Sequence, residues 1–149
     1  MGTYIQNRKA RFNFEIIETF EAGIVLSGQE VKSIRNGKGK LEGAYVLVRG
    51  GEAFLVSASV SPYQVANTAK NYEPERVRKL LLSKKELAHL EQQTETARLT
   101  AVPIRLYSAG RNIKLEFAIA RGKRNYDKRE TLKARDSKRD IDRTLKSQQ

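Results

Sequence analysis

The apolar alternation that runs through most of this sequence stops at about residue 121. Before that point, short segments place apolar residues at every second position, as half-buried strands do. Over residues 121–149 the only large aliphatic side chains are Leu132, Ile141 and Leu145. These are too few to offset an ordering entropy of about 1 to 2 kcal/mol per residue. The pattern predicts a folded body over residues 1–120 and a tail over residues 121–149 that is disordered alone.

The first of two predicted hairpins lies in the middle of the body. Residues 44–48 and 53–60 flank a turn at residues 49–52, whose two glycines suit the left-handed angles of a primed turn. On the second strand, the pattern predicts that Phe54, Val56, Ala58 and Val60 share one face.

The second predicted hairpin lies just before the tail. Apolar residues alternate over 102–106 and again over 113–119, with a turn at residues 108–111. Pro103 cannot donate a backbone hydrogen bond, so its place in the first strand indicates a sheet edge or a bulge.

Two helices are predicted between the strands. Ser83 and Glu86 have the spacing of a capping box, which predicts a helix from Ser83 to about Thr96, with residues 79–82 leading into it. Residues 28–35 form a second, shorter candidate, because Val31 and Ile34 would share one side of it.

The remaining segments of the body are predicted from local patterns. Alternation over residues 12–16 indicates a strand, and Gly23 indicates a bend in the chain at residues 20–23. Residues 36–40 and 64–76 are rich in polar residues and turn formers, which indicates loops.

These elements define the expected fold class. Five or six short antiparallel strands with inserted helices are stable only if the sheet curls and closes. We therefore expect a mainly β fold with accessory helices, built as a small OB-like antiparallel β-barrel and followed by a basic C-terminal tail.

The charge of the chain indicates a polyanionic partner. The formal net charge is +12 and the isoelectric point is about 10.1, which attracts nucleic acid, anionic membranes or acidic proteins. Residues 121–149 hold eleven Lys and Arg against five Asp and Glu, so the tail carries half of this charge. The tail has no Gly or Pro after Gly122 and pairs Lys138 with Asp142 at helical spacing, so we expect it to become helical on a polyanion.

Several classes of protein are disfavoured by the composition. There is no cysteine, and the single histidine, His89, makes histidine-based metal sites and catalytic triads improbable. The acidic residues are scattered among basic ones, which disfavours a nuclease, and neither a cofactor nor a metal is expected. Without a long apolar run or a signal-peptide pattern, we expect a cytoplasmic protein with no membrane partner. These features leave open a generic OB-type protein that binds structured RNA or the ribosome.

Six blocks of the sequence, in order and spanning nearly the whole chain, resemble the SmpB family, the protein partner of transfer-messenger RNA. They are Asn7-Arg8-Lys9-Ala10-Arg11, Phe20-Glu21-Ala22-Gly23, Gly28-Gln29-Glu30-Val31-Lys32-Ser33, Gly51-Glu52-Ala53-Phe54-Leu55, Arg78-Lys79-Leu80-Leu81-Leu82, and Ala120-Arg121-Gly122-Lys123 with Asp127-Lys128-Arg129-Glu130.

The resemblance implies a function in trans-translation without catalysis. The OB-like body would bind the tRNA-like domain of transfer-messenger RNA and deliver it to stalled ribosomes. The tail would be placed in the empty decoding centre and mRNA channel of the small subunit. Elongation factor Tu and alanyl-tRNA synthetase would be further partners on the same RNA.

The resemblance also implies two sets of site residues. Residues implied to contact the tRNA-like domain are Asn7, Lys9, Arg11, Glu21, Lys32, Arg35, Leu81 and Ser83. Residues implied to contact the ribosome are Gly122, Lys123, Arg124, Tyr126, Asp127, Lys128, Arg129, Lys133, Arg135, Lys138 and Arg139. Alternative interpretations are a solvated acid or turn cap for Glu21, a core position for Leu81 and a helix cap for Ser83.

Some positions depart from the usual family pattern. Phe12 and Tyr126 stand where histidine is common, so Tyr126 keeps a stacking face but has no titratable nitrogen. Ser83 stands where Asn or His is usual, and Ser137 replaces an aromatic residue late in the tail.

Overall fold

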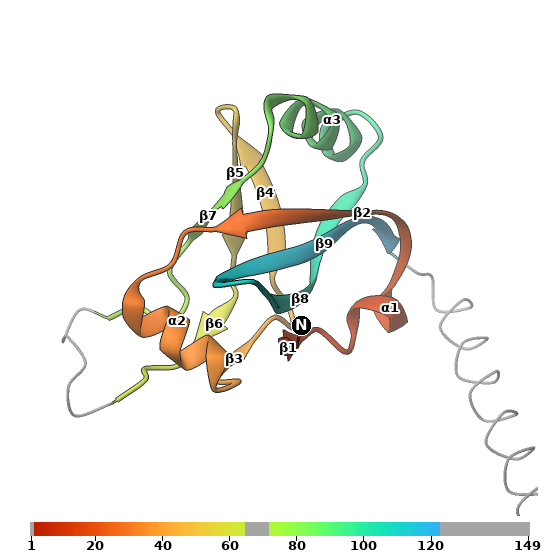
Figure 1. Ribbon diagram of the computed structural model, residues 1–149. Helices are drawn as coiled ribbons and strands as arrows, with labels where there is room; N and C mark the ends of the chain where they lie inside the picture. The colour runs from red at the N-terminus through yellow and green to blue at the C-terminus, as the bar shows by residue number, and fades with distance from the viewer. Residues whose placement is uncertain (1, 65–71, 123–149) are drawn as a thin grey trace, which may run out of the picture.

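The computed structural model describes residues 2–64 and 72–122, and within them strands predominate (Figure 1). The strands are β1 (Thr3–Gln6), β2 (Phe14–Ile24), β3 (Gly39–Lys40), β4 (Tyr45–Arg49), β5 (Glu52–Val56), β6 (Ser59–Val60), β7 (Arg78–Leu81), β8 (Thr100–Ala109) and β9 (Asn112–Gly122). The helices are α1 (Ala10–Asn13), α2 (Gly28–Arg35) and α3 (Lys84–Glu95).

The larger sheet of the described residues closes on itself. Its strands follow the order β1-β8-β4-β5-β7-β2-β9, and β9 pairs again with β8. All of these pairings are antiparallel. The result is a ring of strands, with β1 added at the edge of β8. This confirms the prediction of a mainly β fold with accessory helices.

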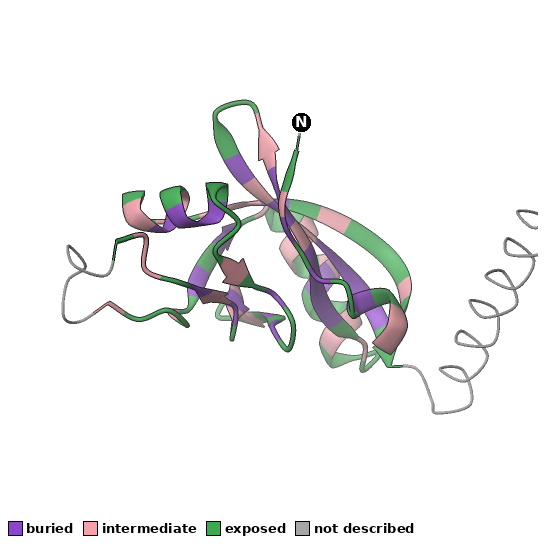
Figure 2. Cartoon of the chain, turned by 90° about the horizontal axis from the view of Figure 1, so that it is seen from below, coloured by how far each residue is buried: buried purple, intermediate pink, exposed green. Residues whose placement is uncertain are grey.

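The core lies inside this ring. Leu55, Leu115 and Phe117 are almost fully buried, and Leu90 of α3 joins the same cluster. Figure 2 shows buried and exposed residues alternating along several strands, as expected when one face of each strand packs inward.

Both predicted hairpins are confirmed. Gly50 and Gly51 have φ angles of 62° and 74°, which places both turn residues between β4 and β5 in the left-handed region. Two left-handed residues in succession match the twist of the flanking strands. Between β8 and β9, the pairing register shifts between Pro103 and Arg105, so the predicted irregularity at the proline is a bulge.

Both longer helices begin at capping boxes. Ser83 accepts a hydrogen bond from the backbone amide of Glu86, and the Glu86 side chain accepts one from the amide of Ser83. Ser27 and Glu30 repeat this arrangement at the start of α2. These reciprocal contacts satisfy amides that the first turn leaves free.

Several local predictions are wrong. The bend at residues 20–23 is absent, because Gly23 lies inside the continuous strand β2 and pairs on both sides. Phe12 belongs to α1 instead of a strand, Gly39 and Lys40 form β3, and residues 78–81 form β7. These are cases in which long-range pairing overrides local signals.

The prediction that Phe54, Val56, Ala58 and Val60 share one face is also wrong. Ala53 and Leu55 point into the core, whereas Phe54 and Val56 are only partly buried. Ser57 has a φ angle of 64°, which interrupts the alternation between β5 and β6. In β5 the buried residues have odd numbers, Ala53 and Leu55. After Ser57 the buried residues have even numbers, Ala58 and Val60.

Strand β9 extends beyond the predicted end of the body. Gly122, predicted as the first ribosome-contacting residue of the tail, is the last residue of β9 and pairs with Phe14. The other tail residues predicted to contact the ribosome, Lys123, Arg124, Tyr126, Asp127, Lys128, Arg129, Lys133, Arg135, Lys138 and Arg139, lie outside the described residues.

Candidate nucleic-acid interface

A pocket of about 300 Å³ opens on the outer face of the strand ring, where β9, β2 and β7 lie side by side. Gly23 of β2 pairs with Lys114 of β9 on one side and with Leu81 of β7 on the other. A Cβ atom at Gly23 would lie 3.3 Å from Cδ1 of Leu81, so the missing side chain leaves the space open. The remaining lining residues are Ile24, Leu26, Val31, Arg111, Asn112 and Ile113.

One apolar side chain that lines this pocket, Leu81, is unusually exposed to solvent. Leu81 is 56% exposed, one of the most exposed large apolar side chains in the described part of the chain. Sequence patterns left its role open between core and RNA contact, and the structure excludes the core. An exposed leucine beside a glycine offers an apolar surface to a ligand.

Basic side chains border the same pocket. Arg111 and Lys114 line it from the β8–β9 hairpin. Nη2 of Arg35 donates a hydrogen bond to the carbonyl oxygen of Arg111 at 3.0 Å, which ties the end of α2 to this hairpin. Arg111 and Lys114 are not among the site residues predicted from the sequence, because isolated basic residues carry no signal until the β2–β9 register places them near Gly23.

Glu21 lies one row further along β2, on the same face of the sheet as Gly23. It is exposed and pairs with Glu116 of β9. Burial raises the pKa of the Tyr107 hydroxyl, and the hydrogen bond to Glu21 and its negative charge raise it further. Glu21 therefore lies close to Tyr107 and beside a second acid, Glu116, and its contact with RNA stays a prediction.

The predicted site residue Ser83 acts as the N-cap of α3, as described above. It is exposed and lies two residues after Leu81. The capping interpretation is therefore confirmed, and a contact with RNA stays a prediction.

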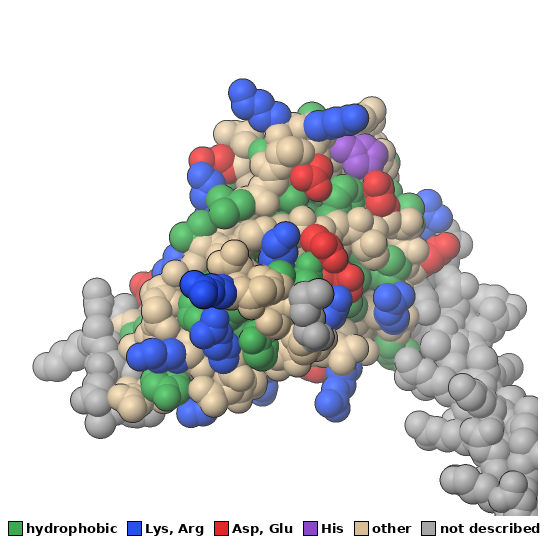
Figure 3. Space-filling model, in the orientation of Figure 1, with side chains coloured by type: hydrophobic (Ala, Val, Ile, Leu, Met, Phe, Trp, Pro, Cys, Tyr) green, Lys and Arg blue, Asp and Glu red, His purple; other side chains and the backbone are tan. Residues whose placement is uncertain are grey.

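Lys32 and Arg35 are exposed on the last turn of α2. Figure 3 shows Lys and Arg side chains gathered over this end of the molecule. Glu21, Leu81 and Arg35 thus share one end of the strand ring with this basic surface.

Three other predicted residues lie at the opposite end. Lys9 and Arg11 are exposed at α1, which stands across the molecule from α2 (Figure 1), because the extended strand β2 separates the two helices. Lys9 and Arg11 therefore do not form one continuous patch with Lys32 and Arg35, and their contacts with RNA stay predictions.

Asn7 has a structural role at the α1 end. Its side chain is 8% exposed and donates a hydrogen bond from Nδ2 to the carbonyl oxygen of Pro103 at 2.9 Å. Asn7 and Lys9 also line a second pocket, of about 630 Å³, which reaches Gly122 at the end of β9.

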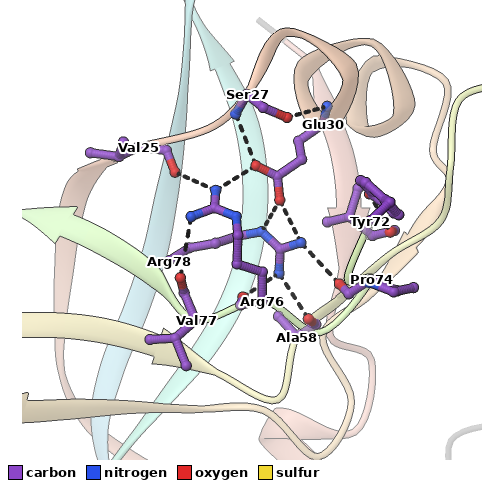
Figure 4. A network of polar contacts seen from close by, with 10 residues as sticks. Val25, Ser27, Glu30, Ala58, Tyr72, Pro74, Arg76, Val77 and Arg78 are labelled. Carbon is purple, nitrogen blue, oxygen red and sulfur yellow. Dashed lines mark hydrogen bonds and ion pairs between the residues drawn. The ribbon is translucent and has the colours of Figure 1, made fainter. Parts of the chain in front are cut away.

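A buried ion-pair network holds α2 in place (Figure 4). The Glu30 carboxylate accepts from Nε of Arg78 at 2.6 Å and from Nη2 of Arg76. Glu30 and Arg78 are each 1% exposed. The Arg78 guanidinium also donates to the carbonyl oxygens of Ala58 and Pro74, at 3.0 and 2.9 Å. The network joins α2 to β7 and thereby fixes the helix that carries Lys32 and Arg35.

Because of this network, the free energy of unfolding should decrease as the pH becomes acidic. Burial raises the pKa of Glu30, but hydrogen bonds from Arg76 and from the Ser27 amide, together with the charge of Arg78, outweigh burial and lower it overall. A depressed pKa contributes stability that is present above the unfolded pKa, about 4.3, and is lost as the pH falls through the folded value. We expect the free energy of unfolding, measured in urea, to fall more steeply below about pH 4 for the unaltered protein than for Glu30→Gln. If the unaltered protein and Glu30→Gln lose stability equally as the pH falls, ionisation of Glu30 is not the cause.

The described residues show no metal-binding arrangement and no membrane-spanning helix. No three His, Asp or Glu side chains gather there in a way that could hold a metal ion. Likewise, no helix in the described ranges is long and apolar enough to cross a bilayer.

Known proteins match this chain over most of its length. The family model for the SmpB protein matches residues 4–147. The SsrA-binding protein of Trichodesmium erythraeum (strain IMS101) is 51% identical over 140 residues, covering 94% of this chain and 90% of the relative. The SsrA-binding protein of Chelativorans sp. (strain BNC1) is 52% identical over 145 residues, covering 97% and 93%.

A solved structure is similar to the fold described above. It carries the description "tmRNA-SmpB: a journey to the center of the bacterial ribosome" and matches with a TM-score of 0.68 and 41% sequence identity. The match covers 85% of this chain and 92% of the other. Together with the family model and the two relatives, this match shows that the chain belongs to the SmpB family.

Proposed function

We propose that this protein is an RNA-binding adaptor of trans-translation. It binds the tRNA-like domain of transfer-messenger RNA and delivers this RNA to stalled ribosomes. Its relatives are SsrA-binding proteins, and its structural neighbour is described as tmRNA-SmpB on the bacterial ribosome. The net charge of +12 favours such a partner.

The observation that carries this proposal is the apolar pocket with its basic border. A nucleobase or ribose enters beside Leu81 and Gly23, while Arg111 and Lys114 neutralise neighbouring phosphates. Glu21 is an acceptor on the same face, suited to a base amino group or a 2′-hydroxyl. This combination favours a folded RNA with accessible bases or riboses over a regular duplex, which offers mainly its phosphates to such a surface.

The second part of the proposal concerns the tail. The residues that follow β9, 123–149, enter the empty decoding centre and mRNA channel, where the basic residues contact ribosomal RNA and Tyr126 stacks on a base. Gly122 ends β9 beside α1, away from the pocket near α2. The chain can therefore hold the tRNA-like domain at one end and start the tail at the other.

The proposal extends to the setting of this activity. The protein catalyses no reaction itself and works in the cytoplasm. Elongation factor Tu and alanyl-tRNA synthetase act on the same RNA while the protein is bound.

The experiment compares the full chain with a version that ends at Gly122, since ending at Ala120 would remove two residues of β9. Binding is titrated across salt for a tRNA-like fragment of transfer-messenger RNA, an ordinary tRNA and an unrelated duplex. We expect both proteins to prefer the tRNA-like fragment, and only the full chain to support tagging on stalled ribosomes. Equal affinity for all three RNAs would instead favour a generic binder of structured RNA or ribosomes.

A further inference from the structure

Two lysines from different segments converge on one tyrosine ring. Nζ of Lys32, in the last turn of α2, lies 5.7 Å from the centroid of the Tyr63 ring. Nζ of Lys38, which follows α2, lies 5.8 Å from the same centroid. Both distances are within the roughly 6 Å range of a cation–π contact.

Backbone contacts fix this arrangement. The amide of Lys38 donates to the carbonyl oxygen of Ser33 at 2.9 Å, and the carbonyl oxygen of Lys38 accepts from the amide of Ser61 at 3.1 Å. The next residues pair as β3 and β6, with Gly39 opposite Val60. Lys38 is therefore held between α2 and the strand that leads to Tyr63.

The arrangement concentrates positive charge without an acidic partner. No ion pair joins Lys32 or Lys38 to an acid within the described ranges. Each ammonium group has three N–H donors, and a ring face uses them only weakly. Two like charges held near one ring repel each other, and an anion bound between them would relieve that repulsion.

We propose that Lys32, Lys38 and Tyr63 form a subsite for one phosphodiester group of the bound RNA. The two ammonium groups hold the phosphate oxygens, and the Tyr63 ring positions the ammonium groups. This inference rests on the proposed function, and it adds Lys38 and Tyr63 to the surface that binds RNA. Arg35, one turn after Lys32, connects the subsite with the pocket through its bond to Arg111.

The test uses full-length variants and the salt dependence of their binding to the tRNA-like fragment. For Lys32→Gln/Lys38→Gln, we expect the slope of log affinity against log salt to become shallower by about 0.7 to 0.9, the value for one phosphate. For Tyr63→Leu, which keeps both charges, we expect a loss in affinity of about two- to fivefold. Tyr63→Phe keeps the ring face and should bind like the unaltered protein.

Several outcomes would overturn the subsite. A slope that stays unchanged in the double variant shows that the lysines bind no phosphate, and a change twice as large shows two separate phosphates. Equal affinity of Tyr63→Leu and Tyr63→Phe removes the positioning role of the ring. Lys84→Gln/Lys85→Gln, in the first turn of α3, controls for the loss of two charges elsewhere. If the unaltered protein shows no preference for the tRNA-like fragment, the proposed function fails, and slopes on an unrelated duplex still test the subsite.

Discussion

Replacing Arg78 with methionine is expected to lower the free energy of unfolding by about 3 to 5 kcal/mol. The substitution removes the fully buried cation from the Glu30 carboxylate and leaves this carboxylate with the half-exposed Arg76 and the Ser27 amide. It also removes the donors to the carbonyl oxygens of Ala58 and Pro74. Breaking a buried ion pair by removing one partner costs far more than losing a surface ion pair, because the remaining buried charge is then incompletely compensated. Urea unfolding at neutral pH measures the loss.

Two further variants distinguish the loss of a buried ion pair from the loss of side-chain packing. Lys79→Met changes the next residue, whose ion pair with Glu52 is about half exposed on both sides, and should cost about 1 kcal/mol or less. Combining Arg78→Met with Glu30→Met should recover part of the loss, because no charge then stays buried alone. If the double variant is less stable than Arg78→Met by the full cost of a second core substitution, the charge explanation is wrong.

Filling the pocket at Gly23 is expected to weaken RNA binding while leaving the fold intact. Gly23→Val places methyl groups against Leu81, where the tRNA-like domain would enter. We expect an affinity loss of about tenfold, or about 1.4 kcal/mol, within the range of one base-stacking contact. Stability should change little, because valine suits a strand and the exposed Leu81 side chain can move aside. Fluorescence anisotropy with a labelled tRNA-like fragment measures the affinity.

The matched control for this prediction is Thr19→Val on the same strand. Thr19 is exposed and lies outside the pocket, so the variant adds apolar surface to β2 without closing it. We expect its affinity to equal that of the unaltered protein. Full RNA affinity in Gly23→Val would show that the pocket receives no part of the RNA.

Local signals in the sequence were sufficient for the two longer helices, α2 and α3, and for the hairpins. The capping box at Ser83 sets the start of α3, and Gly50 and Gly51 set the turn between β4 and β5. In each case the interacting groups are a few residues apart, so a short stretch of sequence contains the whole interaction.

Features that depend on distant residues could not be predicted in this way. Strand β7 was not predicted because residues 78–81 become a strand only by pairing with β5 and β2. The left-handed angle at Ser57 interrupts the alternation that predicted one shared face from Phe54 to Val60. The pocket has the same origin, since only the register across three strands brings Lys114, Gly23 and Leu81 into one row.

The long pairing of β2 with β9 sets the distance between the pocket at Gly23 and the end of β9, where the tail begins. It extends from Phe14 opposite Gly122 to Gly23 opposite Lys114. At about 3.3 Å per residue, this ladder separates the root of the tail from the pocket by about 30 Å. The number of paired residues therefore fixes how far from the bound RNA the tail begins. Lengthening both strands by two residues would preserve which side chains face inward, yet would move the two ends apart by about 7 Å.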